Sequence, residues 1–124
     1  MKEIVFKKEV NDKFLTDIGI TAAEGGINYW GKLINYTDYL HGGEAVIGIT
    51  EDCDDLDDSY IFNNDVIAQG LNNIFSKDAS QMICNRAIRN TIMSAIINND
   101  SGDIDAECAD VIVQAGLFNE LIYG

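Results

Sequence analysis

The first periodic run of apolar residues predicts an amphipathic helix near the start of the chain. Leu15, Ile18 and Ala22 recur three and four positions apart, which is the spacing of one helix face. Asn11 or Asp12 precedes them, and either side chain can accept hydrogen bonds from the free N–H groups of a first helical turn. We therefore expect a helix that begins at this cap.

A Gly-Gly pair follows the helix, and a β-hairpin is predicted after it. Gly25 lies where a helix would end in a left-handed residue, and Gly26 permits the change of direction. Residues 27–36 hold rings and β-branched side chains, which favour a strand, and residues 45–50 have the pattern of a buried strand. The polar residues 37–43 between them form a turn too short for a parallel crossover, so we expect antiparallel pairing.

The second half of the chain alternates capping residues with apolar stripes, which predicts three helices. The last of them is apolar around most of its circumference, so we expect it to be buried on several sides, in the core or in an oligomer interface. Residues 121–123 are also apolar and are expected to dock on this chain or on another subunit. The predicted helices run from Asn63 or Asn64 to about Lys77, from Ser80 to about Asn98, and from Asp103 or Asp105 to near Phe118.

Together these elements predict the fold class. Residues 3–8 add a short strand or an extended arm, which gives the order β-α-β-β-α-α-α. The 124 residues suit one domain, residues 1–124, whose folding buries about two-thirds of the surface of the unfolded chain. We predict an α+β fold in which a small antiparallel β-sheet packs with about four helices.

A formal charge of −13 narrows the range of partners. This charge repels nucleic-acid phosphates and anionic lipid surfaces, so we expect neither DNA or RNA nor a membrane as a partner. No apolar run is long enough to cross a bilayer, and residues 1–8 become charged too early for a signal peptide. A cytoplasmic location is therefore expected.

Metal-binding and catalytic patterns are weak in this sequence. The three cysteines are far apart and His41 is the single histidine, so a structural zinc site is not expected. The acidic run 51–58 lacks the glycine and glutamate positions of an EF-hand calcium loop, and we interpret it as solvated. The sequence has no nucleophile pattern beside His41, no P-loop and no dinucleotide-binding glycine motif. We therefore expect no enzyme activity, no metal and no cofactor.

The chain has two arginines, and they lie three positions apart on one predicted helix, so they share a face. Arg86 and Arg89, with Asn90 beside them, can hold phosphate oxygens bidentately. The alternative is that both arginines pair with the protein's own surface carboxylates, where such pairs add little stability. Both hypotheses remain open at this point: an anion site on this helix face, and ion pairs with surface carboxylates.

Two further groups of residues are candidates for contact with a ligand. Trp30 and Tyr29 either stack on a flat ring such as a purine or belong to the core. Asp110 and Gln114, with Glu107, form a polar stripe on the last helix, which either contacts a base edge and ribose hydroxyls or satisfies neighbouring groups. The candidate ligand-binding residues are Arg86, Arg89, Asn90, Trp30, Tyr29, Glu24, Asn28, Phe75, Asp110 and Gln114.

Two stretches of the chain resemble a known family. They are residues 22–30, AAEGGINYW, and residues 103–118, DIDAECADVIVQAGLF. With Tyr123-Gly124, the length and the helix order, they make the chain similar to the first Thoeris anti-defence family. Members of that family are phage proteins that sequester cyclic ADP-ribose signals made by TIR-domain immune enzymes. The resemblance spans nearly the whole chain.

The resemblance implies a homo-oligomer that binds glycocyclic ADP-ribose, and in some members cyclic oligonucleotides, without cleaving it. The rings of Trp30, Tyr29 and Phe75, the arginines and the polar stripe suit the adenine, diphosphate and riboses of such a ligand. We therefore expect a phage or prophage protein that blocks TIR-based Thoeris immunity in an infected or lysogenic bacterial host. The alternative is an acidic protein-interaction inhibitor or nucleic-acid mimic, for which the run 51–58 is the distinguishing feature.

Overall fold

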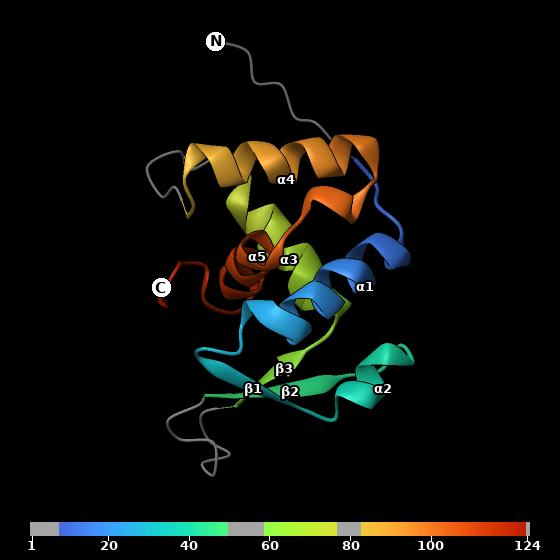
Figure 1. The fold of residues 1–124 in the computed structure, drawn as a ribbon. Coiled ribbons are helices and arrows are strands. Elements are labelled where there is room, and N and C mark those ends of the chain that lie inside the picture. The colour runs from blue at the N-terminus through green and yellow to red at the C-terminus, as the bar shows by residue number, and fades with distance from the viewer. Residues whose placement is uncertain (1–7, 50–58, 77–82, 124) are drawn as a thin grey trace.

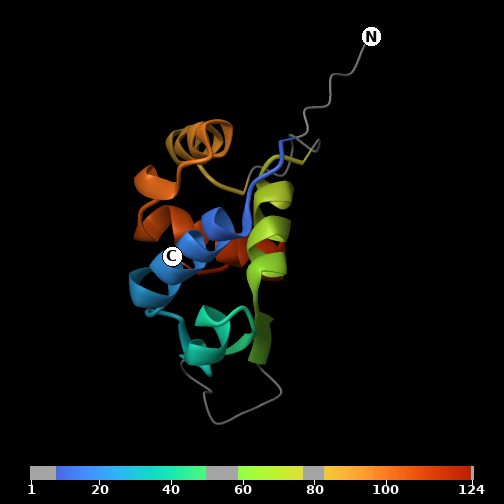
Figure 2. The same cartoon turned by 90° about the vertical axis from the view of Figure 1, so that its right-hand side faces the viewer.

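The computed structural model is a stack of three layers (Figure 1). Helix α4 (Arg86–Asn98) forms the outermost layer, and a three-stranded sheet forms the layer farthest from it. Between them lie α1 (Asp12–Thr21), α3 (Asn64–Ile74) and α5 (Ala106–Phe118). Figure 2 shows α4 nearly end-on and separated from the sheet by this middle layer. The structure describes residues 8–49, 59–76 and 83–123.

Helix α1 confirms the first predicted helix and its cap. The Asn11 side chain accepts a hydrogen bond from the backbone N–H of Phe14 at 2.8 Å. The helix does not end in a left-handed Gly25, because it continues as a π-helical turn, η1 (Ala22–Gly26), and the φ of Gly25 is not positive. That prediction was wrong.

Gly26 has a packing role instead. A Cβ atom at this position would lie 2.8 Å from the carbonyl oxygen of Ala106 and 3.3 Å from the backbone nitrogen of Asp110. Only a residue without a side chain lets η1 approach the first turns of α5 so closely. This contact positions the residues that follow η1 beside α5.

The three strands pair in the order β1-β2-β3, and both pairs are antiparallel. Strands β1 (Gly31–Ile34) and β2 (Ala45–Ile49) confirm the predicted hairpin. Strand β1 is shorter than predicted, because residues 27–30 form a turn in which Ile27 accepts hydrogen bonds from Trp30 and Gly31. Strand β3 (Ser59–Phe62) was not predicted.

The connection between β1 and β2 is more structured than the predicted turn. Asn35 adopts the left-handed conformation with a φ of 63°, and the short helix α2 (Tyr36–Leu40) follows it. Gly42, with a φ of 85°, then reverses the chain toward β2. A left-handed residue costs glycine and asparagine less than other residues, which explains both positions.

Helices α3 and α5 form the centre of the molecule. Asn63 caps α3 by accepting a hydrogen bond from Val66 N at 3.1 Å, as predicted, and Asp105 caps α5 by accepting from Cys108 N at 2.8 Å. Gly70 of α3 lies against the carbonyl of Ile112, and Gly116 of α5 lies against the carbonyl of Val66. All eight residues from Cys108 to Ala115 are buried, which confirms the prediction that the last helix is covered on several sides.

Helix α4 begins later than the predicted Ser80. Asn85 is its N-terminal cap and accepts a hydrogen bond from the backbone N–H of Ile88 at 2.9 Å. Ile92 and Ala95 of α4 are buried, and Ala87 in its first turn is exposed. The inward face of α4 is therefore centred on the middle of the helix.

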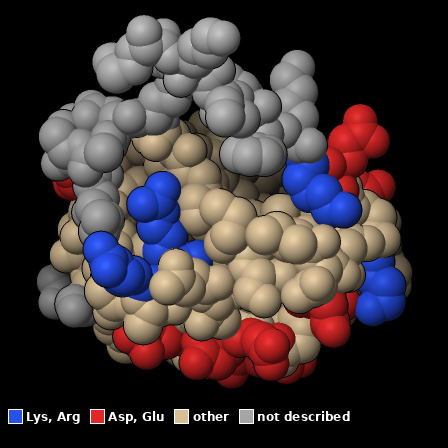
Figure 3. All heavy atoms as spheres, turned by 90° about the horizontal axis from the view of Figure 1, so that it is seen from above, with Lys and Arg blue, Asp and Glu red and all other residues tan. Residues whose placement is uncertain are grey.

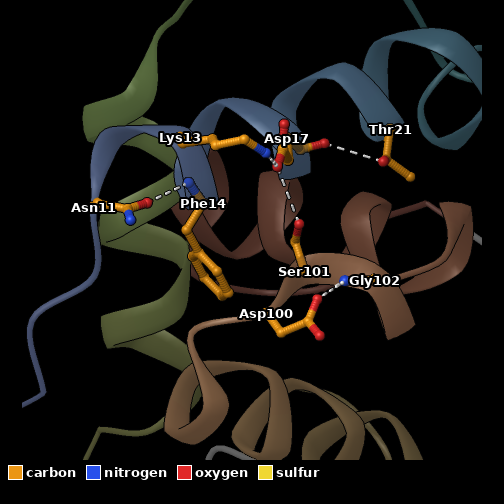
Figure 4. Close-up of polar contacts among 8 residues, drawn as sticks. All are labelled: Asn11, Lys13, Phe14, Asp17, Thr21, Asp100, Ser101 and Gly102. Atoms are coloured by element: carbon orange, nitrogen blue, oxygen red, sulfur yellow. Dashed lines mark hydrogen bonds and ion pairs between the residues drawn. The ribbon is translucent and has the colours of Figure 1, made fainter.

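A hydrogen bond between two polar side chains links α1 to the turn after α4 (Figure 4). The Lys13 ammonium lies 2.8 Å from the Asp17 carboxylate, and the Ser101 hydroxyl donates to the same carboxylate at 3.3 Å. Ser101 begins the short 3₁₀ helix η4 (Ser101–Asp103), in which Asp100 accepts from Gly102 N at 2.9 Å. The bond between Ser101 and Asp17 joins α1 to the turn after α4, and the other two bonds order α1 and that turn internally.

The predicted α+β class is confirmed, with five α-helices among the described residues where about four were expected. The acidic run 51–58 lies outside the described residues, as does the arm over residues 3–8 apart from Lys8. None of the helices in the described part of the chain has the length and hydropathy needed to cross a bilayer.

Candidate functional site

A groove with a volume of about 450 Å³ lies where η1, the starts of α4 and α5, and residues 119–123 meet. We call residues 119–123, which run back along α5, the return segment. Most of the lining is uncharged, but two carboxylates, two phenols and an amide also line the groove. The polar lining residues are Glu107, Asp110, Tyr29, Tyr123 and Asn85.

Asp110 is the centre of the hydrogen-bond network at the groove. This buried carboxylate accepts from the Tyr29 hydroxyl at 2.5 Å, from the Trp30 indole N–H at 2.8 Å and from the Gln114 amide at 2.9 Å. A buried carboxylate is costly unless it is fully hydrogen-bonded, and three donors meet that need. The network holds the side chains of Tyr29 and Trp30, which lie in the turn after η1, against α5.

Gln114 holds the return segment to α5. Its side chain is fully buried, although glutamine is a polar residue. Its Oε1 atom accepts from the backbone N–H groups of Ile122 and Tyr123 at 2.9 and 2.8 Å, and its Nε2 atom lies 3.1 Å from the carbonyl of Tyr123. The return segment is not part of a helix or sheet, and the side-chain amide of Gln114 forms hydrogen bonds with its backbone instead.

The return segment is held with little net stability. Its apolar side chains Leu121 and Ile122 are 41% and 49% exposed, so they contribute little burial. Its five hydrogen bonds within the described residues, to Gln114, Tyr29 and Ala115, contribute about 1 kcal/mol each, and the contacts of the Tyr123 ring with Trp30 and Phe118 add about 1 kcal/mol each. Ordering each backbone residue costs about 1–2 kcal/mol, so the sum over five residues is close to balance.

Trp30 is a core residue and does not form an open wall for a ligand. It is 3% exposed, and one face of its ring is stacked on Tyr123, with centroids 5.0 Å apart and planes 4° apart. Phe118 meets it edge-on at 5.9 Å. Of the two alternatives for Trp30, the structure therefore shows the core position, because the chain's own tyrosine covers the ring.

Tyr29 is the aromatic side chain that does line the groove. It is 56% exposed, but its hydroxyl is directed to Asp110. Burial of this hydroxyl end, followed by its hydrogen bond to the Asp110 carboxylate, raises the pKa of Tyr29 to about 12. The phenol therefore remains a protonated hydrogen-bond donor at physiological pH.

The predicted arginines lie on α4 next to the groove and do not line it. Asn85 and Ile88 of α4 line it, and the arginines directly follow each of them in sequence. Arg89 is partly buried, with its guanidinium 5.2 Å from the centre of the Phe75 ring, whereas Arg86 and Asn90 are exposed. Within the described residues neither guanidinium forms an ion pair with a carboxylate.

The charged side chains of α4 are both basic. Helix α4 contains Arg86 and Arg89 and no aspartate or glutamate. Figure 3, seen from the α4 side, shows basic side chains on a largely uncharged surface, with acidic side chains around its periphery. An anion that approaches this side of the groove meets less repulsion than the formal charge of −13 suggests.

Asn28 and Glu24 lie away from the groove. Asn28 lines a second, shallower depression of about 450 Å³ together with Lys32 and Tyr36. Glu24 is exposed on η1, and burial followed by the charge of Glu24 raises the pKa of Tyr36. The ten predicted residues are therefore not brought together at one site: Tyr29 and Asp110 line the groove, and the others lie in the second depression, in the buried network, on α4, at the end of α3 or on η1.

The sequence reasoning missed the role of Tyr123. The apolar character of residues 121–123 predicted docking, and the structure confirms docking on this chain, but the pattern did not indicate Trp30 as the contact. Asn85 lies at the groove wall because it is the N-terminal cap of α4, which starts later than the predicted Ser80.

The groove residues favour hydrogen bonding over bond-breaking chemistry. Burial raises the pKa of the Cys84 thiol at the groove wall, although nearby Arg89 opposes the change, so the thiol is not an activated nucleophile. In the described ranges, no three His, Cys, Asp or Glu side chains form a group that can hold a metal ion. The groove presents donors and acceptors at fixed positions beside two cationic side chains.

Comparison with known proteins adds no constraint on this site. The chain matches no protein-family model, no curated protein and no solved structure.

Proposed function

We propose that this chain binds a small nucleotide-type ligand in the groove and holds it without changing it. The observation that carries the proposal is a separation of charge: the carboxylates of Glu107 and Asp110 line the groove, and Arg86 and Arg89 lie on the adjoining turns of α4. A nucleotide has the complementary separation, because its base and ribose offer N–H and O–H donors whereas its phosphates attract guanidinium groups.

The size and lining of the groove support a ligand of this class. Its volume of about 450 Å³ is within the range of about 300–1,000 Å³ that is usual for small-molecule sites. Ile88, Val111 and Leu121 provide apolar surface, and the exposed Tyr29 ring provides a face on which a flat group can stack. Asn85 adds an amide at the α4 wall.

The resemblance to the Thoeris anti-defence family provides the first ligands to test. Under this proposal the ligand is a cyclic ADP-ribose immune signal, with glycocyclic ADP-ribose as the leading isomer. The chain then acts as a phage or prophage sponge in a bacterial host, and a homo-oligomer is the expected assembly. Sequestration requires only that the bound signal stays intact and is not released to its receptor.

Calorimetric titration of the wild-type chain with separate cyclic ADP-ribose isomers tests this function. We expect saturable heat for at least one isomer. Ligand recovered after heating the complex should have an unchanged mass and chromatographic retention. Absence of heat with every isomer would contradict the ligand class, and recovery of a linear or hydrolysed product would contradict holding without change.

A further inference from the structure

The return segment occupies a place with the chemistry of a nucleobase site. Its Tyr123 ring lies parallel to Trp30, which is the arrangement that a stacked base adopts on an aromatic side chain. The Gln114 amide meets the segment with its acceptor Oε1 and its donor Nε2 together. Glutamine presents the same pair of atoms to the N6 and N7 edge of adenine.

The segment and the groove are continuous. Leu121 and Tyr123 belong to the lining of the groove, and the Tyr29 hydroxyl lies 3.1 Å from the carbonyl of Tyr123. A ligand in the groove therefore contacts the segment directly. Because the segment has two exposed apolar side chains and no regular secondary structure, it is among the least stable parts of the described fold.

We infer that Tyr123 is an internal competitor for a purine-binding site formed by Trp30, Asp110 and Gln114. In the free protein the return segment fills this site and satisfies the buried amide. A purine that carries an amino group replaces both contacts, stacking on Trp30 and pairing with Gln114, and displaces residues 122–123. This inference rests on the proposed function, which it deepens by naming the base class and the element that controls access.

The test compares Tyr123→Ala with Tyr123→Phe, using AMP as the probe and ribose 5-phosphate as the probe without a base. Trp30 is the single tryptophan of the chain, so its fluorescence reports on the stack directly. Loss of the competing ring should tighten AMP binding by up to about tenfold in Tyr123→Ala. Tyr123→Phe should match wild type, and ribose 5-phosphate should not distinguish the three proteins.

Two results would overturn the inference. One is a folded Tyr123→Ala protein, with cooperative urea unfolding, that binds AMP no more tightly than wild type. The other needs no variant: in wild type, saturating AMP should speed hydrogen exchange at the Ile122 and Tyr123 amides, and unchanged or slower exchange contradicts displacement. AMP binding without this release, or no AMP binding by either wild type or Tyr123→Ala, refutes the competitor alone, whereas absence of heat with every cyclic ADP-ribose isomer refutes the proposed function.

Discussion

At the scale of single residues, the side chain of Gln114 connects more parts of the chain than most buried side chains do. A glutamine is rarely buried completely, and this one contacts Asp110 and two backbone positions of the return segment. A buried amide is tolerated because each of its polar atoms has a partner. Its substitution should therefore affect distant parts of the chain together.

Gln114→Leu keeps the side chain's approximate size and removes these bonds. We expect a loss of about 2–4 kcal/mol in the free energy of unfolding, because Asp110 loses a donor and the amides of residues 122 and 123 lose their acceptor. Urea denaturation measures this loss. Asn90→Leu, at an exposed position of α4, is the matched control and should change stability by less than about 0.5 kcal/mol. Equal stability of the two variants would show that the Gln114 bonds are unimportant.

The raised pKa of Tyr29 gives a second prediction at this scale. Its value of about 12 in the folded protein exceeds the ordinary 10.0, so the unfolded chain ionises first as the pH rises. The stability associated with this phenol is complete below pH 10 and is lost as the pH rises toward about 12. The ring carbon shifts of Tyr29, assigned with Tyr29→Phe, report its pKa by NMR.

Asp110→Asn provides the matched comparison for that titration. Burial of the hydroxyl remains in this variant, but the hydrogen bond to a carboxylate and its negative charge are removed. We expect the pKa of Tyr29 to fall below the wild-type value. An identical pKa in the two proteins would mean that the carboxylate does not act on the phenol.

At the scale of elements, the close contact of η1 with α5 determines where the groove lies. Gly26→Ala should destabilise the fold by about 1–3 kcal/mol, because the added methyl group would lie 2.8 Å from the Ala106 carbonyl oxygen. Gly25→Ala is the matched control, since its methyl group would meet Ala106 at an ordinary 3.8 Å. Urea midpoints that fall equally in both variants would show that the close approach of Gly26 to the Ala106 carbonyl is not the cause, because helix propensity alone favours alanine over glycine.

The sequence predicted elements whose signals are local. Asn11, Asn63 and Asp105 cap helices as expected, because a capping side chain acts on its own first turn. The prediction failed where the structure of a segment depends on contact with another segment that is distant in the sequence. Strand β3 has only four residues and forms by pairing with β2. The helical turn of η1 continues through Gly26 because the backbone of Gly26 packs closely against the first turn of α5.

The candidate site was predictable only in part, for the same reason. The polar stripe of Asp110 and Gln114 was visible from its helical spacing, and the structure shows that it joins Tyr29, Trp30 and the return segment. The alternative in which it satisfies neighbours is the one observed. That Tyr123 covers Trp30 was not predictable, because the contact joins positions 93 residues apart.

At the scale of the whole molecule, the distribution of charge matters more than its sum. The chain carries a formal charge of −13, but its two arginines lie together on a helix that has no carboxylate. Long-range repulsion therefore opposes extended polyanions, whereas a small anion interacts mainly with the local field. This contrast favours a phosphorylated small molecule over nucleic acid as the partner.

The arginine assignment predicts the response of ligand affinity to substitution. Arg86→Ala and Arg89→Ala should each weaken binding of the cyclic ADP-ribose isomer by about 10–100-fold, since each removes charged hydrogen bonds to phosphate. Lys13→Ala removes the same charge from α1 and is the control, with affinity expected to stay within about twofold of wild type. Unchanged affinity in both arginine variants would discard the assignment, and an equal loss in all three would indicate a general charge effect.

Nuclear magnetic resonance tests the binding site most directly. A ¹⁵N–¹H titration of the wild-type chain with the cyclic ADP-ribose isomers follows the single indole N–H of Trp30 and the amides of Gly26, Glu107 and Tyr123 at once. We predict saturable shifts of these four signals at a common ligand concentration, with smaller changes at Lys32 in the second depression. Saturable shifts confined to the second depression, or no shifts with any isomer, would contradict a ligand site in the groove.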